Sequence, residues 1–184
     1  MKRSSGRFLT TPTGSLPRPD ELAEMLFEDC AGTLTDRAGL ESRVASAVAE
    51  AVRRQAELGL DVIGDGEMSK ISYATYVTQR LSGFDAAVES PRPVWPDMAD
   101  FPTFAKRYLE QSAASPRVKL RTCTGEVRYV GHAALEQDMT NLQAALTDLD
   151  VEEVFVTAAS PGLIAFFHRN HFYKEYDDYV WALA

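Results

Sequence analysis

The stretch Leu58-Gly-Leu-Asp-Val-Ile-Gly-Asp-Gly-Glu-Met-Ser-Lys70 decides the fold class of this 184-residue chain. Its first half is an apolar run, typical of a strand that is buried on both faces. Its second half, from Asp65 to Glu67, is a polar turn. The earlier stretch Phe8-Leu-Thr-Thr-Pro-Thr-Gly-Ser-Leu-Pro-Arg-Pro19 repeats the pattern of a strand that runs into a turn. In parallel α/β folds the loops at the carboxyl ends of the strands hold ligands, so we expect a binding site at these two turns.

The spacing of apolar residues around these strands predicts the other elements. Helices are predicted over residues 20–27, 38–58, 69–81, 133–149 and 173–184. Strands are predicted over residues 7–13, 60–64, 117–123 and 154–158. The proline-rich stretch after Gly83 makes residues 84–105 a long excursion, with a short helix over residues 104–112. We therefore expect an α/β fold, a partial TIM (β/α)8 barrel of about the first four β/α units, with the excursion after the second strand.

Two of these helices have an apolar face that we expect to be buried. On the helix over residues 38–58, this face consists of Leu40, Val44, Ala47, Val48, Ala51, Val52 and Leu58. On the helix over residues 133–149, it consists of Leu135, Met139, Leu142, Ala145, Leu146 and Leu149.

The bulk properties exclude several classes of protein. A formal net charge of −8 argues against a nucleic-acid partner. The chain lacks a run of about 18 apolar residues, so we expect no membrane span. The two cysteines, Cys30 and Cys123, lie far apart and do not indicate a disulfide scaffold, so we expect a reducing, cytoplasmic location. A complete barrel typically needs ~250 residues. We therefore interpret residues 1–184 as the truncated N-terminal half of a barrel domain.

Several stretches of the chain resemble the cobalamin-independent methionine synthase family, in particular its short single-barrel branch. The stretches are TTPTGSLPRPDEL, AVAEAVRRQAELGLDVIGDGEMSK, SYATYVTQRLSGF, CTGEVRYVGHAALEQDMTNLQAAL, EEVFVTAASPG and YKEYDDYVWALA, and they follow in order along nearly the whole chain. The resemblance implies a zinc-dependent barrel enzyme that transfers a methyl group from 5-methyltetrahydrofolate to the thiol of homocysteine, giving methionine. Related barrels act on other thiols, including coenzyme M.

The resemblance also implies which residues bind the substrate. It assigns the amino-acid carboxylate of homocysteine to the loop of Thr13, Gly14 and Ser15, and the ammonium group to Glu67. The chemistry is suitable, because a glycine turn forms a small anion nest and a carboxylate makes a charge-assisted hydrogen bond with an ammonium group. The family's zinc ligands would lie outside this chain, so we assign no metal ligand here. We identify no catalytic residue.

Other residues allow simpler interpretations beside the functional ones. Asp65-Gly66 is also a common turn dipeptide. His168 and His171, at i and i+3, could hold a metal ion, but ordinary hydrogen bonds explain them as well. Cys123 has no local His–Asp arrangement that would make it a nucleophile. The aromatic residues near the end of the chain could stack on a pterin, but core packing explains them equally.

Glu126 is the clearest departure from the family pattern. It stands where the family usually has a proline after Thr-Gly, and it puts a charge near the expected mouth of the barrel. This substitution weakens the expectation that the methyl-donor side of the pocket is kept.

The sequence leaves two hypotheses open. In the first, the intact protein is a methyltransferase that acts on a small thiol amino acid. In the second, the chain is a non-catalytic fragment that folds by self-association, because half a barrel exposes a strand edge and an apolar face. We expect residues 1–184 to form a homo-oligomer.

Overall fold

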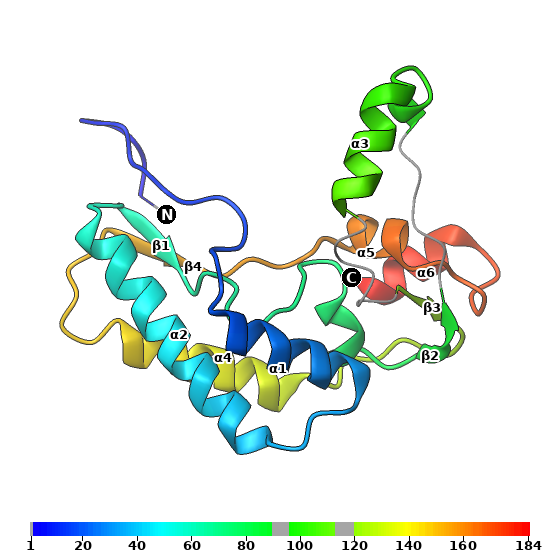
Figure 1. Ribbon diagram of the computed structural model, residues 1–184, viewed down its shortest axis with the longest axis horizontal. Helices are drawn as coiled ribbons and strands as arrows, with labels where there is room; N and C mark the ends of the chain where they lie inside the picture. Colours follow the sequence, from blue (N-terminus) through cyan, green and yellow to red (C-terminus); the bar gives the residue numbers. More distant parts are fainter. Residues whose placement is uncertain (1, 90–95, 113–119) are drawn as a thin grey trace. The chain divides into compact units, whose positions relative to one another are not determined.

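Helix α2 (Arg37–Glu57) is the longest element of this computed structural model, which describes residues 2–89, 96–112 and 120–184 (Figure 1). The described residues form two units. The first unit contains the residues up to Tyr76 together with Gly131–Ala158, and the second contains Val77–Val130 and Ala159–Ala184. No helix in the described part of the chain is both long and apolar enough to cross a membrane.

The buried face of α2 is the centre of the first unit. Six of its predicted residues are buried, namely Leu40, Val44, Ala47, Val48, Ala51 and Val52. The prediction for Leu58 is wrong, since this side chain is 63% exposed. The helix ends at Glu57, and Gly59 follows in the left-handed conformation with a φ of 73°. Leu58 still has helical backbone angles and donates its N–H to the Arg54 carbonyl, so it caps the last turn of the helix, and the chain leaves the helical path at Gly59.

A parallel pair of strands lies beside α2. Strand β1 (Val62–Gly64) pairs with β4 (Glu153–Phe155), with Ile63 opposite Val154. Gln55, on the buried face of α2, donates to the Gly64 carbonyl at 2.8 Å and accepts the Gly64 N–H at 3.1 Å. A Cβ on Gly64 would lie 2.9 Å from the Phe155 carbonyl oxygen, so glycine lets the two strands approach.

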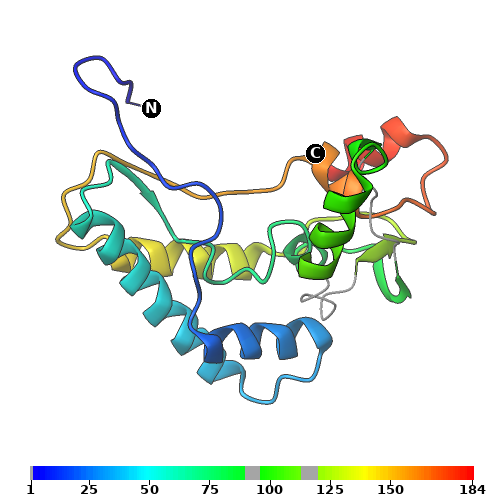
Figure 2. The ribbon, with the colours of Figure 1, turned by 45° about the horizontal axis from the view of Figure 1, so that its top comes forward.

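Helices α1 (Asp20–Ala31) and α4 (His132–Ala145) both pack against α2, and both views show α2 crossing α4 (Figures 1 and 2). Leu22 and Leu26 of α1 are buried, and so is Leu142 of α4. The predicted inward positions of Leu135 and Met139 are wrong, because these side chains are 43% and 38% exposed. The buried residues of α4 are Asn141 and Leu142, toward its carboxyl end.

The strand predicted over residues 7–13 is not formed. This segment is extended and lies against β1, because the Thr10 carbonyl accepts the N–H groups of Asp61 and Val62 at 3.1 and 3.0 Å. Pro12 has no N–H to donate to a ladder, which explains why the pairing stops. The segment therefore follows the direction of a sheet strand without being part of the sheet.

Asp61 fastens this N-terminal segment to the rest of the unit. Its carboxylate pairs with Arg7 and accepts the Thr10 N–H at 2.7 Å and the Thr10 hydroxyl at 3.0 Å. The Arg7 guanidinium, with these Thr10 hydrogen bonds, holds the pKa of the Asp61 carboxyl well below its ordinary range.

We expect this lowered pKa to make stability depend on acid pH. The unfolded chain binds the Asp61 proton more readily than the folded chain. The stabilisation is therefore complete above the ordinary aspartate pKa of about 3.9, and is lost as pH falls from there toward the lowered pKa. Urea unfolding at several pH values should show that Asp61→Asn costs stability at pH 7 and progressively less below pH ~4. The exposed Asp100→Asn is the control, and an Asp61→Asn cost that does not change with pH would contradict the prediction.

The helix predicted over residues 69–81 is wrong. The chain forms turns here, followed by a short 3₁₀ helix, η1 (Tyr76–Gln79). The Ser72 hydroxyl accepts the Ala74 N–H, and hydroxyl side chains compete in this way with the helical hydrogen-bond pattern. The Ser72 carbonyl accepts the Tyr76 N–H, a bond of the helical kind that leads into η1. The predicted apolar face is also incomplete, since Tyr73 is 47% exposed.

The second unit contains an antiparallel pair of strands, β2 (Phe84–Glu89) and β3 (Arg121–Cys123). Its helices are α3 (Pro102–Ser112), α5 (Pro161–Phe167) and α6 (Tyr176–Leu183), and a short 3₁₀ helix, η2 (Pro96–Met98), precedes α3. The helices predicted over residues 104–112 and 173–184 are confirmed with shifted starts. Residues 84–89 were expected to be irregular, and they form β2 instead. The predicted break over residues 90–95 and the start of the third strand at residues 117–119 lie outside the described residues.

The strand pairing differs from the predicted barrel order. The third predicted strand corresponds to β3, which pairs antiparallel with β2, whereas β1 and β4 are parallel. Within residues 2–89, 96–112 and 120–184 the sheet is therefore partial. The fold is α/β, and the arrangement of four successive β/α units is not confirmed.

Candidate substrate-binding site

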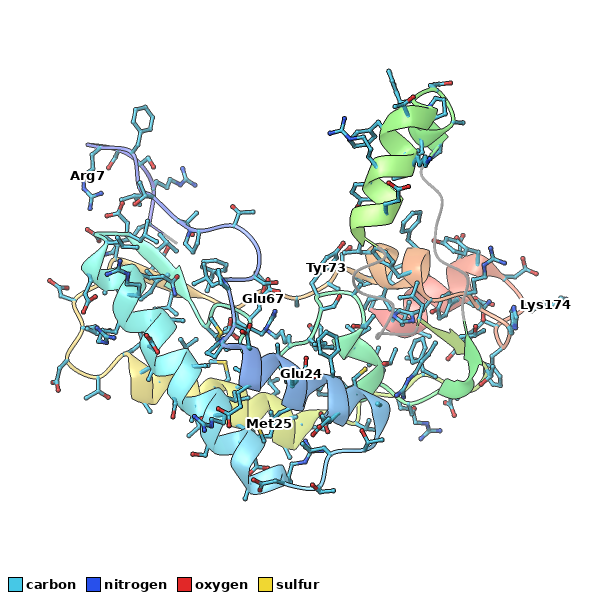
Figure 3. All side chains as sticks on the ribbon, viewed as in Figure 1. Arg7, Glu24, Met25, Glu67, Tyr73 and Lys174 are labelled. Carbon is cyan, nitrogen blue, oxygen red and sulfur yellow. The ribbon has the colours of Figure 1, made fainter. Side chains whose placement is uncertain are left out.

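Glu67 lies in the turn that follows β1, next to the segment that leads into α1 (Figure 3). Its side chain is buried, and its backbone adopts the left-handed conformation with a φ of 58°. Gly66, just before it, has a φ of 66°. The Asp65 carboxylate accepts the Glu67 N–H at 2.9 Å, which closes the turn. A glutamate held in this conformation indicates a turn that its surroundings strongly constrain.

Two hydroxyl groups bind the Glu67 carboxylate. Ser15 donates to Oε2 at 2.9 Å, and Thr157 donates to Oε1 at 3.0 Å. The three residues follow the extended N-terminal segment, β1 and β4, so they meet at the carboxyl ends of these neighbouring segments. The structure thus brings Ser15 and Glu67 together, as the sequence predicts, and adds Thr157, which the sequence analysis missed.

The Thr13-Gly14-Ser15 loop is held against the turn of Glu67. Gly14 has a φ of 78°, a conformation that favours glycine. The Leu16 N–H donates to the Gly66 carbonyl at 3.1 Å. Thr13 and Gly14 line an open cleft of about 470 Å³, whose lining also includes Val62, Phe155 and Thr157. Ser15 of this loop therefore contacts the Glu67 carboxylate, while Thr13 and Gly14 border the cleft.

Lys70 is a buried cation next to Asp65 and Thr157. Its Nζ lies 3.3 Å from Asp65 Oδ2 and donates to the Thr157 carbonyl at 3.3 Å. It also lies 5.5 Å from the centre of the Tyr76 ring. Lys70 therefore links the turn after β1 to Thr157, in the segment that follows β4. The role of Lys70 was not predicted, although this lysine ends the stretch Leu58–Lys70 three residues after Glu67.

Arg18 is the second cation of the site. Its guanidinium donates to the carbonyl of Glu67 at 2.8 Å and also to the carbonyl of Lys70. Burial lowers the pKa of Arg18, and the nearby carboxylates of Glu67 and Asp65 oppose this effect. No local pattern in the sequence pairs Arg18 with a carbonyl 49 residues along the chain, so its role was not predicted.

The charges of the site balance. Asp65 and Glu67 supply two negative groups, and Arg18 and Lys70 supply two positive groups. Glu67 is the carboxylate that the exposed Ser15 hydroxyl approaches, whereas Asp65 faces Lys70.

His168 and His171, the two histidines considered as possible metal ligands, lie in the second unit. His168 is fully buried, its Nδ1 lies 2.8 Å from the Arg121 carbonyl oxygen, and its ring packs edge-on against Phe84. His171 is exposed. Over the described ranges, three or more histidine, cysteine or acidic side chains do not gather at any point where they could hold a metal ion. His168 therefore packs and bonds as a core residue of this unit.

Cys123 and Glu126 also lie in the second unit. Burial raises the pKa of the Cys123 thiol, which disfavours the nucleophilic thiolate. Glu126 is exposed, and its carboxylate pairs with Arg128 at 2.7 Å. The charge that replaces the family proline is thus neutralised by a neighbour two residues away. Among the aromatic residues, Tyr179 is fully buried and donates to the His168 carbonyl, a packing role.

Comparison with known proteins connects this site to a family. A family model described as "Cobalamin-independent synthase, Catalytic domain" matches residues 8–92, which include both turns of the site. A methionine synthase of Sulfolobus acidocaldarius is 28% identical over 175 residues, covering 95% of this chain and 44% of the relative. A 5-methyltetrahydropteroyltriglutamate–homocysteine methyltransferase of a Synechococcus species is 32% identical over 75 residues, covering 41% of this chain and 10% of the relative.

Solved structures agree on the fold. A B12-independent methionine synthase from Shewanella sp. W3-18-1, in complex with selenomethionine, superimposes with a TM-score of 0.62 at 18% identity. The match covers 94% of this chain and 44% of that structure. Both matches include nearly all of this chain, but the chain spans less than half the length of each relative. Residues 8–92 of this chain thus match the catalytic-domain model of the cobalamin-independent synthases, and nearly the whole chain is similar in sequence and in fold to part of the methionine synthases named above.

Proposed function

We propose that this chain supplies the half of a TIM-type barrel that binds the amino-acid acceptor in a methyl transfer to a thiol. The acceptor is homocysteine, the donor is a methylfolate, and the product is methionine. The observation that carries this proposal is the buried Glu67 carboxylate, which lies beside the Ser15 loop at the carboxyl ends of parallel segments. The names of the related enzymes support the same reaction.

The residues of this chain act by binding and orienting the acceptor. Glu67 accepts hydrogen bonds from the ammonium group of the ligand, and the loop of Thr13, Gly14 and Ser15 faces its carboxylate. The thiol then extends away from these two anchors toward the rest of the barrel. The zinc ion that the family resemblance implies does not fit the described residues, which hold no cluster of ligands. We propose that the other half of the barrel supplies the zinc ligands.

The carboxylate at the centre of the site also discriminates between acceptors. Coenzyme M, the alternative thiol, carries a sulfonate and no ammonium group, so Glu67 would repel it rather than bind it. Homocysteine and methionine carry the ammonium group that complements Glu67. The geometry therefore favours an α-amino acid over a sulfonated thiol. Self-association of the chain stays a prediction.

Isothermal titration of the protein expressed from its complete gene tests the proposal. We expect L-homocysteine and L-methionine to bind and coenzyme M to bind at least tenfold more weakly, a difference of about 1.4 kcal/mol. Methyl transfer from 5-methyltetrahydrofolate to homocysteine then tests the reaction itself. Tighter binding of coenzyme M than of both amino acids would refute the proposed acceptor.

A further inference from the structure

The two hydroxyl groups at Glu67 differ in how firmly they are held. Ser15 is exposed and follows Gly14 in a loop. Thr157 is partly buried, and its carbonyl accepts a hydrogen bond from the buried Lys70. The threonine side chain is also β-branched and has few rotamers, so its hydroxyl is the better fixed of the two.

The two hydrogen bonds also serve different oxygens of the carboxylate. Ser15 binds Oε2 and Thr157 binds Oε1. An ionised carboxylate has about four acceptor positions, so one hydroxyl on each oxygen leaves hydrogen-bonding capacity for an ammonium group. If Ser15 turns its hydroxyl toward the carboxylate of a ligand, Thr157 remains as the group that keeps Glu67 in place.

We infer that Thr157 is a positioning residue, which orients the Glu67 carboxylate toward the ammonium group of the bound amino acid while Ser15 exchanges its hydrogen bond to the ligand. This inference rests on the proposed function. Its chemical content is specific, because the hydroxyl of Thr157 acts on the ligand only through Glu67. The effect should therefore be confined to ligands that carry an ammonium group.

Two variants separate this role from simple packing. Thr157→Val keeps the branched shape and removes the hydroxyl, whereas Thr157→Ser keeps the hydroxyl and removes a methyl group. Thr140→Val is the matched control, because Thr140 is exposed on α4 and its hydroxyl donates to the Glu136 carbonyl of the same helix.

The experiment measures the dissociation constants of two ligands by calorimetry, using the protein expressed from its complete gene. One ligand is L-methionine, and the other is 4-(methylsulfanyl)butanoate, which is the same molecule without the amino group. In Thr157→Val we expect L-methionine to bind roughly threefold to tenfold more weakly, because one hydrogen bond to a charged group is lost. Binding of the des-amino ligand should not change. Thr157→Ser should restore the wild-type ratio, and Thr140→Val should keep it.

The same ligand pair, measured on Glu67→Gln, separates the two proposals. If Glu67→Gln lowers the preference for L-methionine but Thr157→Val keeps it at the wild-type value, the inference about Thr157 is overturned and the proposed function stands. If neither variant changes the preference, the proposed function fails and the inference fails with it. Should Thr157→Val not fold, as judged by its circular dichroism, Thr157→Ala is measured in its place with the same two ligands.

Discussion

Replacement of Lys70 by methionine is expected to lower the free energy of unfolding by about 3–5 kcal/mol. The side chains of Lys70 and Asp65 are 4% and 7% exposed, and their charged atoms lie 3.3 Å apart. Methionine has a similar length but no charge, so Asp65 would be left as a buried carboxylate without its cation. The Thr157 carbonyl would lose its hydrogen bond from Nζ as well.

Urea unfolding followed by circular dichroism measures this effect. The double variant Lys70→Met/Asp65→Asn should recover much of the loss, because it removes the lone charge while the asparagine oxygen can still accept the Glu67 N–H. Lys106→Met is the matched control, since Lys106 is 79% exposed in its side chain and lies 4.0 Å from Glu110. We expect that control to equal the wild type within error. If Lys70→Met does so too, then Lys70 and Asp65 are not a buried pair in solution.

The helices of the first unit could be predicted because burial repeats at the helical period. Six of the seven apolar residues assigned to one face of α2 are buried. The exception, Leu58, depends on where the helix ends, and a local turn decides that. In the same way, the apolar spacing on α4 predicts Leu135 and Met139 to be buried. The helix nevertheless buries its residues only near its carboxyl end, which the spacing alone does not indicate.

The strand pairing and the irregular segments could not be predicted from local patterns. Residues 84–89 read as part of a proline-rich excursion, yet they form β2 because β3 offers them an antiparallel partner. Residues 69–81 have the apolar spacing of a helix, but hydroxyl groups such as that of Ser72 bond to the backbone instead. In both cases, partners outside the local window determine the structure.

In the candidate site, too, some contacts could be predicted from local patterns and others depend on distant partners. The approach of Ser15 to Glu67 could be predicted, because each follows an extended segment and such ends meet at one edge of a parallel sheet. Thr157 contacts Glu67 across a sequence separation of 90 residues, and the register of β4 against β1 determines this contact. Lys70 and Arg18 bind backbone carbonyls, which carry no residue-specific signal in a sequence.

Replacement of Glu67 by glutamine is expected to weaken binding of the amino-acid acceptor by roughly tenfold to hundredfold, which corresponds to a loss of ~1.5–3 kcal/mol. Glutamine has the same shape, and its amide can still bond with the hydroxyls of Ser15 and Thr157, so the turn should keep its structure. What it cannot supply is the negative charge that makes the hydrogen bond to the ligand's ammonium group strong. The methyl donor makes no use of that charge in the proposed site, and its affinity should stay close to that of the wild type.

Acceptor and donor titrations on the protein expressed from its complete gene test this prediction. Glu57→Gln is the control for the loss of one negative charge, because Glu57 lies at the end of α2 and pairs with Arg53 at the surface. We expect that variant to bind the acceptor like the wild type. Equal acceptor affinity in Glu67→Gln and the wild type would remove Glu67 from the binding site. The turn after β1 would then be a structural feature, in which Asp65 and Lys70 brace the end of a strand and the buried carboxylate serves only to bind two hydroxyl groups.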